Sequence, residues 1–583
     1  MPEGATLHSM YVRHLQSVAG LVALASIVSP NYAQQPPQLP SAGQILKDIE
    51  DKPQPVRPTP PPRIEVAPET RRAIKPPPSL KVDIKAFRFS GLTSVSEERL
   101  QAVVQKFIGP NKTFDDLQAA VEAVSEYLQQ QGYFVAQAFL PEQKIESGLV
   151  EIAVLEGRLG EIKLEMDQGV PVSRSIIDGL LSSMPPGTVL HRDTVERVLF
   201  LLSDLRGMAV RSVVEPGAQP GTANLLVKVS ARKRVDGSIE FDRQGSRYTG
   251  DYRAGASMDI NSPFGRGDLL SFRGLMSIPG GGRSLEFGRL SYLSPVGNYG
   301  TRLGAAYSRL NYHLGTATFE ALDQGGRAEV VSVFGLHPFI RTRNLNIFGQ
   351  LGFDVREFQD EFRAVGVFVD KKTKVATVAM VGDSRDALLG GGINNFSLGY
   401  TAGKLDADFT LPTGQVTTGV GPEGHYSRLN GSVARLNALA ESTVLYLSYT
   451  FQLASKNLDV SEEMSLGGPN AVRAYPLGEG SADEAQLFTA EIRFGVPRTT
   501  FVPGNVVVSA FFDVGHGKVN HDPLPGQTFS NTRTISGAGF GLTWGRQDDF
   551  LIRGSLAWRL TGRSTSEPVD RTPRLYFQAA KYF

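Results

Sequence analysis

The chain has 583 residues, with 60 Lys and Arg against 59 Asp and Glu, a formal net charge of +1, and no cysteine. This length is too great for a single small module. The lack of cysteine excludes a disulfide scaffold, a zinc ribbon and a cysteine nucleophile, and the near-zero charge gives no argument for nucleic-acid binding. Helical membrane spans are excluded because no run of about 18 apolar residues occurs, although membrane-crossing strands leave no such run.

The first 33 residues have the pattern of a secretory signal peptide. Arg13 and His14 precede a short apolar stretch, 18–28, and Ala33 is the candidate for the last residue removed. The alternative interpretation is a buried N-terminal helix. The apolar stretch is too short to span the membrane as an anchor. Because the chain has no cysteine for lipid attachment, we expect an exported protein of the bacterial cell envelope.

A short amphipathic helix follows within residues 34–52. Ser41 is a predicted helix cap, and the apolar residues of the segment share one narrow face. These residues are Ile45, Leu46 and Ile49. A helix of about three turns is marginal alone and needs a surface to pack against.

Residues 53–79 contain ten prolines and predict an extended, semi-rigid tether. A short helix on such a tether can occupy a site in the same molecule and leave it. We therefore interpret 34–52 as a plug-like segment, with a disordered tail as the alternative.

Residues 80–235 predict two small units, 80–158 and 159–235, that each run strand, helix, helix, strand, strand. In the first unit the expected elements are a strand from Val82 that is interrupted at Ala86, helices at 100–107 and 114–130, and strands at 133–140 and 149–155. In the second they are a strand at 161–165, helices at 172–181 and 192–205, and strands at 209–215 and 224–230. Such units present strand edges and grooves to peptides.

Three segments of this region resemble the paired POTRA domains of two-partner secretion transporters, above all those of the hemolysin secretion/activation family. They are FSGLTSV at 89–95, the run at 132–157 and the run at 196–229. The middle run has GY, LPxQ, GxVxI and EG in the family's order. The resemblance implies periplasmic domains that capture an unfolded exoprotein at its N-terminal secretion signal.

From residue 236 to the end, apolar and polar residues alternate in runs of about ten, closed by Gly, Pro, Asn or Asp. Clear examples are 445–453 and 488–496. This pattern is typical of a transmembrane β-barrel, whose strands must close because every backbone group in lipid needs a partner. The turn signals predict about sixteen strands, with the least defined boundaries in 360–425. A soluble sandwich or propeller would also alternate, but it explains neither the export signal nor the lack of a blade-length repeat.

The last strand ends in Phe583, and Leu575, Phe577 and Ala579 share its parity. This ending is similar to that of bacterial outer-membrane barrels and implies that Phe583 is an outer-membrane assembly signal. The implied partners during biogenesis are the barrel assembly machinery and periplasmic chaperones. Lys581 interrupts the apolar set, but its long side chain can snorkel.

A connection of about thirty residues, 455–485, interrupts the barrel and is far longer than a hairpin loop. The family carries a V-R-G-[YF] tetrad at the tip of a loop folded into the lumen. Val472, Arg473, Ala474 and Tyr475 match it, except that Ala474 replaces glycine. An alanine is strained at positive φ, so either the tip differs from the family's or its backbone is ordinary.

The family also has an aspartate on the inner wall within F-x-D-x-G, matched here by Phe511, Asp513 and Gly515. Alternation along 506–512 independently directs Asp513 into the lumen. An arginine in a narrow lumen needs a carboxylate to offset its desolvation. We therefore predict an Arg473–Asp513 pair; without the resemblance, a solvated arginine and an interfacial aspartate would be the simpler interpretation.

The sequence contains neither an H-E-x-x-H nor a G-x-S-x-G motif, and we predict no catalytic, metal or cofactor residue. The resemblance implies an outer-membrane pore that captures an unfolded exoprotein, of the β-helical adhesin or cytolysin type, and translocates it to the cell surface. Outer-membrane lipid would surround the barrel. The alternatives are a BamA-like insertase, which usually has more POTRA domains and no proline-rich tether, and a passive porin, against which the two periplasmic units argue.

Overall fold

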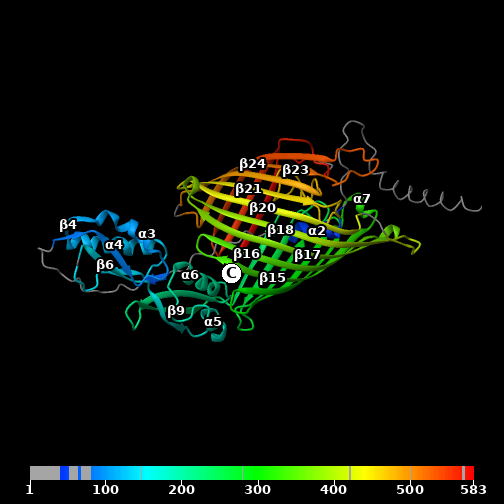
Figure 1. Cartoon of the computed structure of the whole chain (residues 1–583). Coiled ribbons are helices and arrows are strands. Elements are labelled where there is room, and N and C mark those ends of the chain that lie inside the picture. Colours follow the sequence, from blue (N-terminus) through cyan, green and yellow to red (C-terminus); the bar gives the residue numbers. More distant parts are fainter. Residues whose placement is uncertain are drawn as a thin grey trace, which may run out of the picture.

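The computed structural model describes residues 40–50, 64–66, 81–145, 147–278, 280–418, 422–498, 501–567 and 571–583. Two small α+β units precede a large β-barrel (Figure 1). The predicted signal peptide lies outside the described residues, as does the proline-rich segment apart from a three-residue strand. In the part of the chain that is described, no helix is both long and apolar enough to cross a membrane.

The first α+β unit, 81–157, packs its helices and strands around one core. Its elements are β2 (Lys81–Ile84), β3 (Ala86–Ser90), α3 (Glu97–Val104), η2 (Gln105–Phe107), β4 (Gly109–Thr113), α4 (Phe114–Gln130), β5 (Gln137–Phe139) and β6 (Leu149–Leu155). The sheet order is β3-β6-β5, with β3 parallel to β6, and β2 pairs with β4. Helical periodicity predicts the bounds of α4 correctly. Strand β4 was not predicted, and the strand expected over 133–140 is only three residues long because turns occupy 134–135.

Two of the family-like segments meet at one buried carboxylate, that of Glu156, which is 6% exposed. It accepts hydrogen bonds from the backbone N–H groups of Thr93 at 2.5 Å and Ser94 at 2.6 Å, and from the Thr93 hydroxyl. Burial raises the pKa of Glu156, but these hydrogen bonds outweigh burial and leave its pKa below the ordinary value. Glu156 therefore fixes the turn that follows β3.

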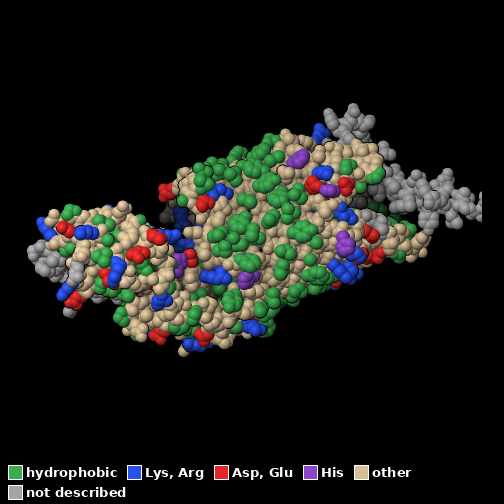
Figure 2. All heavy atoms as spheres, in the orientation of Figure 1, with side chains coloured by type: hydrophobic (Ala, Val, Ile, Leu, Met, Phe, Trp, Pro, Cys, Tyr) green, Lys and Arg blue, Asp and Glu red, His purple; other side chains and the backbone are tan. Residues whose placement is uncertain are grey.

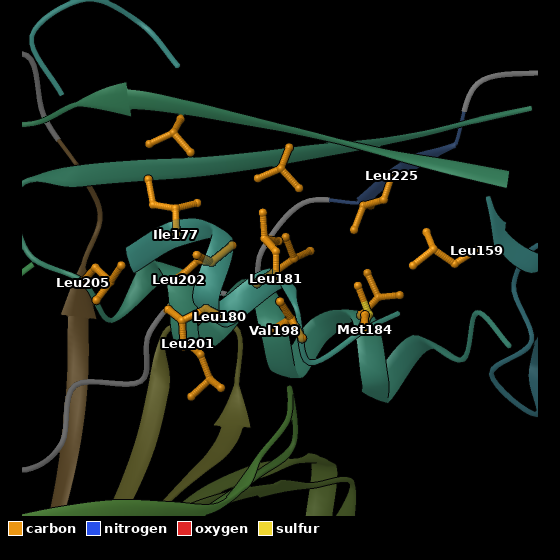
Figure 3. Packing of buried hydrophobic residues seen from close by; sticks show 14 of the residues in the cluster. Leu159, Ile177, Leu180, Leu181, Met184, Val198, Leu201, Leu202, Leu205 and Leu225 are labelled. Carbon is orange, nitrogen blue, oxygen red and sulfur yellow. The ribbon is translucent and has the colours of Figure 1, made fainter. Parts of the chain in front are cut away.

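The second α+β unit, 158–231, has the predicted order of elements. They are β7 (Arg158–Met166), α5 (Arg174–Leu181), α6 (Arg192–Ser203), β8 (Met208–Pro216) and β9 (Thr222–Ala231). Figure 3 shows leucine and isoleucine side chains of α5 and α6 pointing toward side chains such as Leu225 on the sheet. Burial of each such side chain stabilises the unit by roughly 1.5–3 kcal/mol.

The tether adds to this unit a strand that the sequence pattern does not predict. Strand β1 (Ile64–Val66) pairs in parallel with β8, in register Ile64↔Ser212, Glu65↔Val213 and Val66↔Val214. The resulting order is β1-β8-β9-β7. Within the described sheet, β8 would otherwise be an edge strand, so the tether covers backbone groups that another strand could bind.

The barrel closes with sixteen strands, in agreement with the prediction, and a short strand, β19 (Val416–Thr418), pairs with β18. The sixteen are β10 (Val235–Asp242), β11 (Arg253–Asn261), β12 (Leu269–Ser277), β13 (Ser284–Val296), β14 (Thr301–His313), β15 (Gln324–Arg341), β16 (Leu345–Phe362), β17 (Val367–Asp386), β18 (Gly392–Thr410), β20 (Gly424–Ala440), β21 (Thr443–Ala454), β22 (Glu484–Val496), β23 (Asn505–Lys518), β24 (Thr532–Arg546), β25 (Phe550–Arg559) and β26 (Arg574–Tyr582). The short helices α7 (Ala317–Glu320), η3 (Arg363–Val365) and η4 (Leu388–Gly390) lie in the connections.

Strands β10 and β26 close the barrel, and Phe583 extends their pairing. Its N–H donates to the Gly237 carbonyl at 3.1 Å, and the Gly237 N–H donates back to the Phe583 carbonyl at 3.2 Å. A Cβ atom on Gly237 would lie 2.5 Å from the Phe583 ring. Glycine at 237 therefore makes room for the terminal aromatic ring.

The second α+β unit is docked on the turns at one end of the barrel, here called the near end; the opposite end is the far end. Arg341 forms an ion pair with Asp204 of the α+β unit, with Nη2 and Oδ1 2.8 Å apart, and Arg343 pairs with Glu196 at 2.8 Å. Figure 2 shows that hydrophobic side chains cover much of the outer wall of the barrel, whereas charged groups gather toward its ends.

Candidate functional site in the barrel lumen

Helix α2 (Ala42–Glu50) lies inside the barrel toward the far end (Figure 1). The predicted apolar residues Ile45, Leu46 and Ile49 are 7%, 3% and 2% exposed. They pack against inward-facing residues of five adjacent strands, β12 to β16. These residues include Leu275, Leu285, Phe287, Leu310, Tyr312, Ala328, Val330 and Phe358. The narrow apolar face that the sequence predicts is the face that meets the wall.

Both ends of α2 are also bound to the wall by polar groups. At its start, the Ala42 N–H donates to Asp360 Oδ1 at 2.7 Å. At its end, Glu50 Oε1 accepts from Arg289 Nη1 and from Ser308 Oγ, each at 2.8 Å. A carboxylate at a helix C-terminus opposes the helix dipole, so Arg289 offsets an unfavourable charge there.

The helix also touches the long connection between β21 and β22, residues 455–483, here called the lumen loop. Lys47 Nζ donates to the backbone carbonyl of Glu463. A Cβ atom added to Gly43 would lie 2.5 Å from Cβ of Ser461, so only glycine permits this close approach. Helix and lumen loop therefore occupy the lumen as one packed body.

The predicted tip residues of the lumen loop are buried against the inner wall. Val472, Ala474 and Tyr475 are at most 2% exposed. They pack with residues of the loop and of the surrounding strands, namely Leu466, Ala482, Ala485, Phe511, Ile535 and Ala557. Gly515 leaves the space that the loop fills, because a Cβ atom there would lie 3.2 Å from Val472 Cγ2.

Arg473 reaches Asp513 on β23. Its Nε donates to Oδ2 and its Nη2 donates to Oδ1, both at 2.9 Å, and its backbone N–H donates to Oδ2 at 3.2 Å. Thr489 Oγ1 also donates to Asp513, at 3.0 Å. A second carboxylate, Glu491 on β22, accepts from Arg473 Nη1 at 2.8 Å, and the guanidinium lies 3.3 Å from the centre of the Phe511 ring.

Ala474, which replaces the family's glycine, has an ordinary backbone conformation. Within the described residues, positive φ at non-glycine positions is confined to six other residues: Asn111, Ser147, Ser262, Asp323, Leu389 and Asp548. The methyl group of Ala474 packs over Gly537 on β24, where an added Cβ atom would lie 2.4 Å from Cβ of Ala474. The strain considered from the sequence is therefore absent at Ala474, and glycine at 537 accommodates the extra methyl group.

Two glutamates that the sequence analysis missed anchor the lumen loop to opposite walls. Glu479, which is fully buried, pairs with Arg533. It also accepts hydrogen bonds from the connection between β25 and β26, with donors in Ser564, Thr565 and Ser566. Glu462 accepts from Arg356 of β16 and Arg428 of β20, each at 2.8 Å, and from Tyr426 at 2.9 Å.

Glu491 could have been found from the sequence, since alternation places it on the lumen-facing side of its strand with Thr489. Glu462 and Glu479 carried no such signal, because a loop has no period from which to derive the direction of its side chains. In the described part of the chain, no three His, Asp or Glu side chains gather where they could hold a metal ion.

Two family models match the chain. A POTRA domain of the ShlB type covers residues 82–157, and the haemolysin secretion/activation protein ShlB/FhaC/HecB covers residues 221–544, more than half of the chain. Both matches fall on the regions described above.

Curated relatives and solved structures agree with these matches. The heme/hemopexin transporter protein HuxB of Haemophilus influenzae (strain 86-028NP) is 29% identical over 466 residues, 79% of this chain and 80% of the relative. The outer membrane transporter CdiB of Dickeya dadantii (strain 3937) is 23% identical over 473 residues, with the same coverage of 79% and 80%.

The structure of CdiB from Escherichia coli has the same fold, with a TM-score of 0.68 at 18% identity, over 93% of this chain and 96% of that chain. CdiB from Acinetobacter baumannii gives a TM-score of 0.58 at 18% identity, with complete coverage of 100% of both chains.

The fold and the filled lumen define an outer-membrane transporter with periplasmic POTRA domains. The chain belongs to the haemolysin secretion/activation family, and it is a transporter of two-partner secretion that moves an exoprotein from the periplasm to the cell surface. The near end of the barrel, which carries the POTRA domains, therefore faces the periplasm, and the far end faces the cell exterior.

Proposed function

We propose that the arrangement described above is the resting, closed state of the transporter, in which α2 is a plug. The observation that carries this proposal is that α2 is bound to the barrel along its whole length. Its apolar face is buried on β12 to β16, and its two ends bond to Asp360 and to Arg289. A helix of three turns has little stability of its own, so its position depends on these wall contacts.

The lumen loop is the second part of the closure. The Arg473–Asp513 pair holds its tip, Glu479 binds it to β24 and to the β25–β26 connection, and Glu462 binds it to β16 and β20. Because α2 contacts this loop through Lys47 and Gly43, departure of the helix removes contacts from the loop. We propose that the helix leaves first and that the loop then yields to the cargo.

The tether supplies a route by which cargo in the periplasm releases the plug. Strand β1 lies between α2 and the first POTRA domain in the chain and covers the β8 edge of the second POTRA domain. An extended segment of an unfolded exoprotein pairs with such an edge through backbone hydrogen bonds. Displacement of β1 by the cargo would free the tether, and with it α2.

We further propose that the exoprotein is of the β-helical adhesin or cytolysin type and that its folding outside the cell drives its passage. In this proposal the transporter uses no cofactor and catalyses no reaction. Outer-membrane lipid surrounds the barrel, and the barrel assembly machinery and periplasmic chaperones act during its biogenesis, with Phe583 in the assembly signal.

The plug is tested by channel conductance in planar bilayers. Removal of residues 34–52 should raise the conductance strongly. Glu50→Ala, which removes the bonds to Arg289 and Ser308, should raise the fraction of time spent open. Glu357→Ala, the same change on the outer face of the barrel, is the matched control and should leave conductance unchanged. Unchanged conductance in the deletion variant would refute the plug.

A further inference from the structure

Three basic side chains form a row on the outer face of the barrel. Lys374 of β17 lies directly opposite Lys404 of β18, and Lys404 lies opposite His425 of β20. All three are exposed. Like charges opposite one another destabilise a pair of strands, so an uncompensated row of this kind is unfavourable by itself.

Neighbouring carboxylates pair with only part of this row. Lys372 is two residues closer than Lys374 to the far end of β17. It lies between Glu357 and Asp406 and forms an ion pair with Glu357. Lys404 has Asp406 at 2.7 Å. Lys374, however, has no ion-pair partner among the residues that the structure describes. Lys374 is therefore the lysine of the row without an ion pair, and Asp370 and Asp408, which lie opposite one another, follow closer to the far end on the same two strands.

The row borders a shallow groove in the lipid-facing wall, which is largely open to the outside and has a volume of about 450 Å³. Small residues, Ala376 and Ala402, lie between the larger Phe353 and Tyr400. Between the groove and the near end, the outward-facing side chains are apolar. They include Leu351, Val378, Met380 and Leu398. A shallow groove lined in this way can accommodate an acyl chain along the wall, with the basic groups at the edge nearer the far end.

The height of the row matches the outer boundary of the membrane. Lys374 is twelve residues from the near end of β17 at Asp386, and Lys404 is twelve residues from the near end of β18 at Gly392. Twelve residues of a tilted strand span about 30 Å, slightly more than the roughly 25 Å apolar band of outer-membrane barrels. The three basic groups thus lie at the level of lipid headgroups in the outer leaflet. Figure 2 shows that charged side chains gather toward that end of the wall.

We propose that Lys374, Lys404 and His425 bind the phosphate group of an anionic lipid in the outer leaflet, and that one acyl chain of this lipid lies in the groove over Ala376 and Ala402. Lysine ammonium groups form strong, charge-assisted hydrogen bonds with phosphate oxygens. A bound phosphate would also remove the repulsion between Lys374 and Lys404. A lipid fits this site better than free phosphate does, because the groove extends from the three basic residues into the apolar band of the wall, where an acyl chain can lie.

The test is native mass spectrometry of the full chain with diphosphorylated lipid A and with the same lipid after removal of its phosphates. Wild type should bind the phosphorylated lipid at least tenfold more tightly than Lys374→Gln/Lys404→Gln does. Lys372→Gln changes the lysine two residues from Lys374 on the same strand, and this control variant should bind the lipid like wild type. Heat-dependent migration in gels verifies that each barrel is folded. Equal binding by the double variant, or equal binding of the dephosphorylated lipid by wild type, would overturn the proposal.

Discussion

The guanidinium of Arg473 forms two parallel hydrogen bonds with the carboxylate of Asp513, each 2.9 Å long, and Asp513 is 1% exposed. Removal of one partner from such a buried pair costs about 3–5 kcal/mol, because the remaining charge has no partner. We therefore expect Arg473→Asp and Asp513→Arg each to impair secretion of the exoprotein. In the double variant the new arginine faces both the new aspartate and Glu491, so secretion should recover in part. A double variant that secretes no better than either single variant would argue against a direct pair.

Ala474 stands where the family has glycine, and its contact with Gly537 predicts how changes at these two positions affect each other. Gly537→Ala should destabilise the loop tip by about 1–3 kcal/mol, since its new Cβ would lie 2.4 Å from Cβ of Ala474. Ala474→Gly should be tolerated and should relieve much of the defect of Gly537→Ala. Thermal unfolding of the purified variants measures both effects, and additive effects of the two changes would contradict the packing described here.

The absence of cysteine from the chain allows a clean test of the tether strand. Glu65 and Val213 are partners in the parallel pairing of β1 and β8, within the reach of a disulfide. Glu65→Cys with Val213→Cys should block secretion when oxidised and restore it after reduction. Arg211→Cys with Lys228→Cys cross-links β8 to β9 and leaves β1 free, so secretion should persist in either state. Normal secretion by the oxidised β1–β8 variant would show that β1 need not leave the edge.

Glu156 should make the first POTRA domain sensitive to acid. Its pKa is lower in the folded chain than in the unfolded chain, so its stabilising contribution is complete above the unfolded value, near pH 4.3. The contribution is lost as the pH falls through the lower, folded pKa. Hydrogen exchange of the Thr93 and Ser94 amides, corrected for intrinsic rates, should show protection that decreases below about pH 4. Glu156→Gln should reduce protection at neutral pH and abolish this pH dependence; an unchanged profile would contradict the assignment.

Periodicity predicts much of this molecule because it depends on local geometry. The 3.6-residue period defines α4 and the apolar face of α2, and the two-residue period directs Asp513 into the lumen. The same reasoning predicts about sixteen strands, and the barrel has sixteen.

What could not be predicted depends on contacts between distant segments. Strand β1 has three residues in a proline-rich stretch and forms only because β8 offers it an edge. Glu462 and Glu479 find their arginines only when the loop is folded into the lumen. The row of Lys374, Lys404 and His425 depends on strand register, which the sequence does not determine by itself.

This chain carries an exoprotein across the outer membrane. The most direct measurement is the location of that exoprotein in cells that lack the transporter. The account predicts that it disappears from the cell surface and medium and is retained or degraded in the periplasm, while other outer-membrane barrels remain at normal levels. A general loss of surface barrels would instead indicate an insertase and would contradict the account.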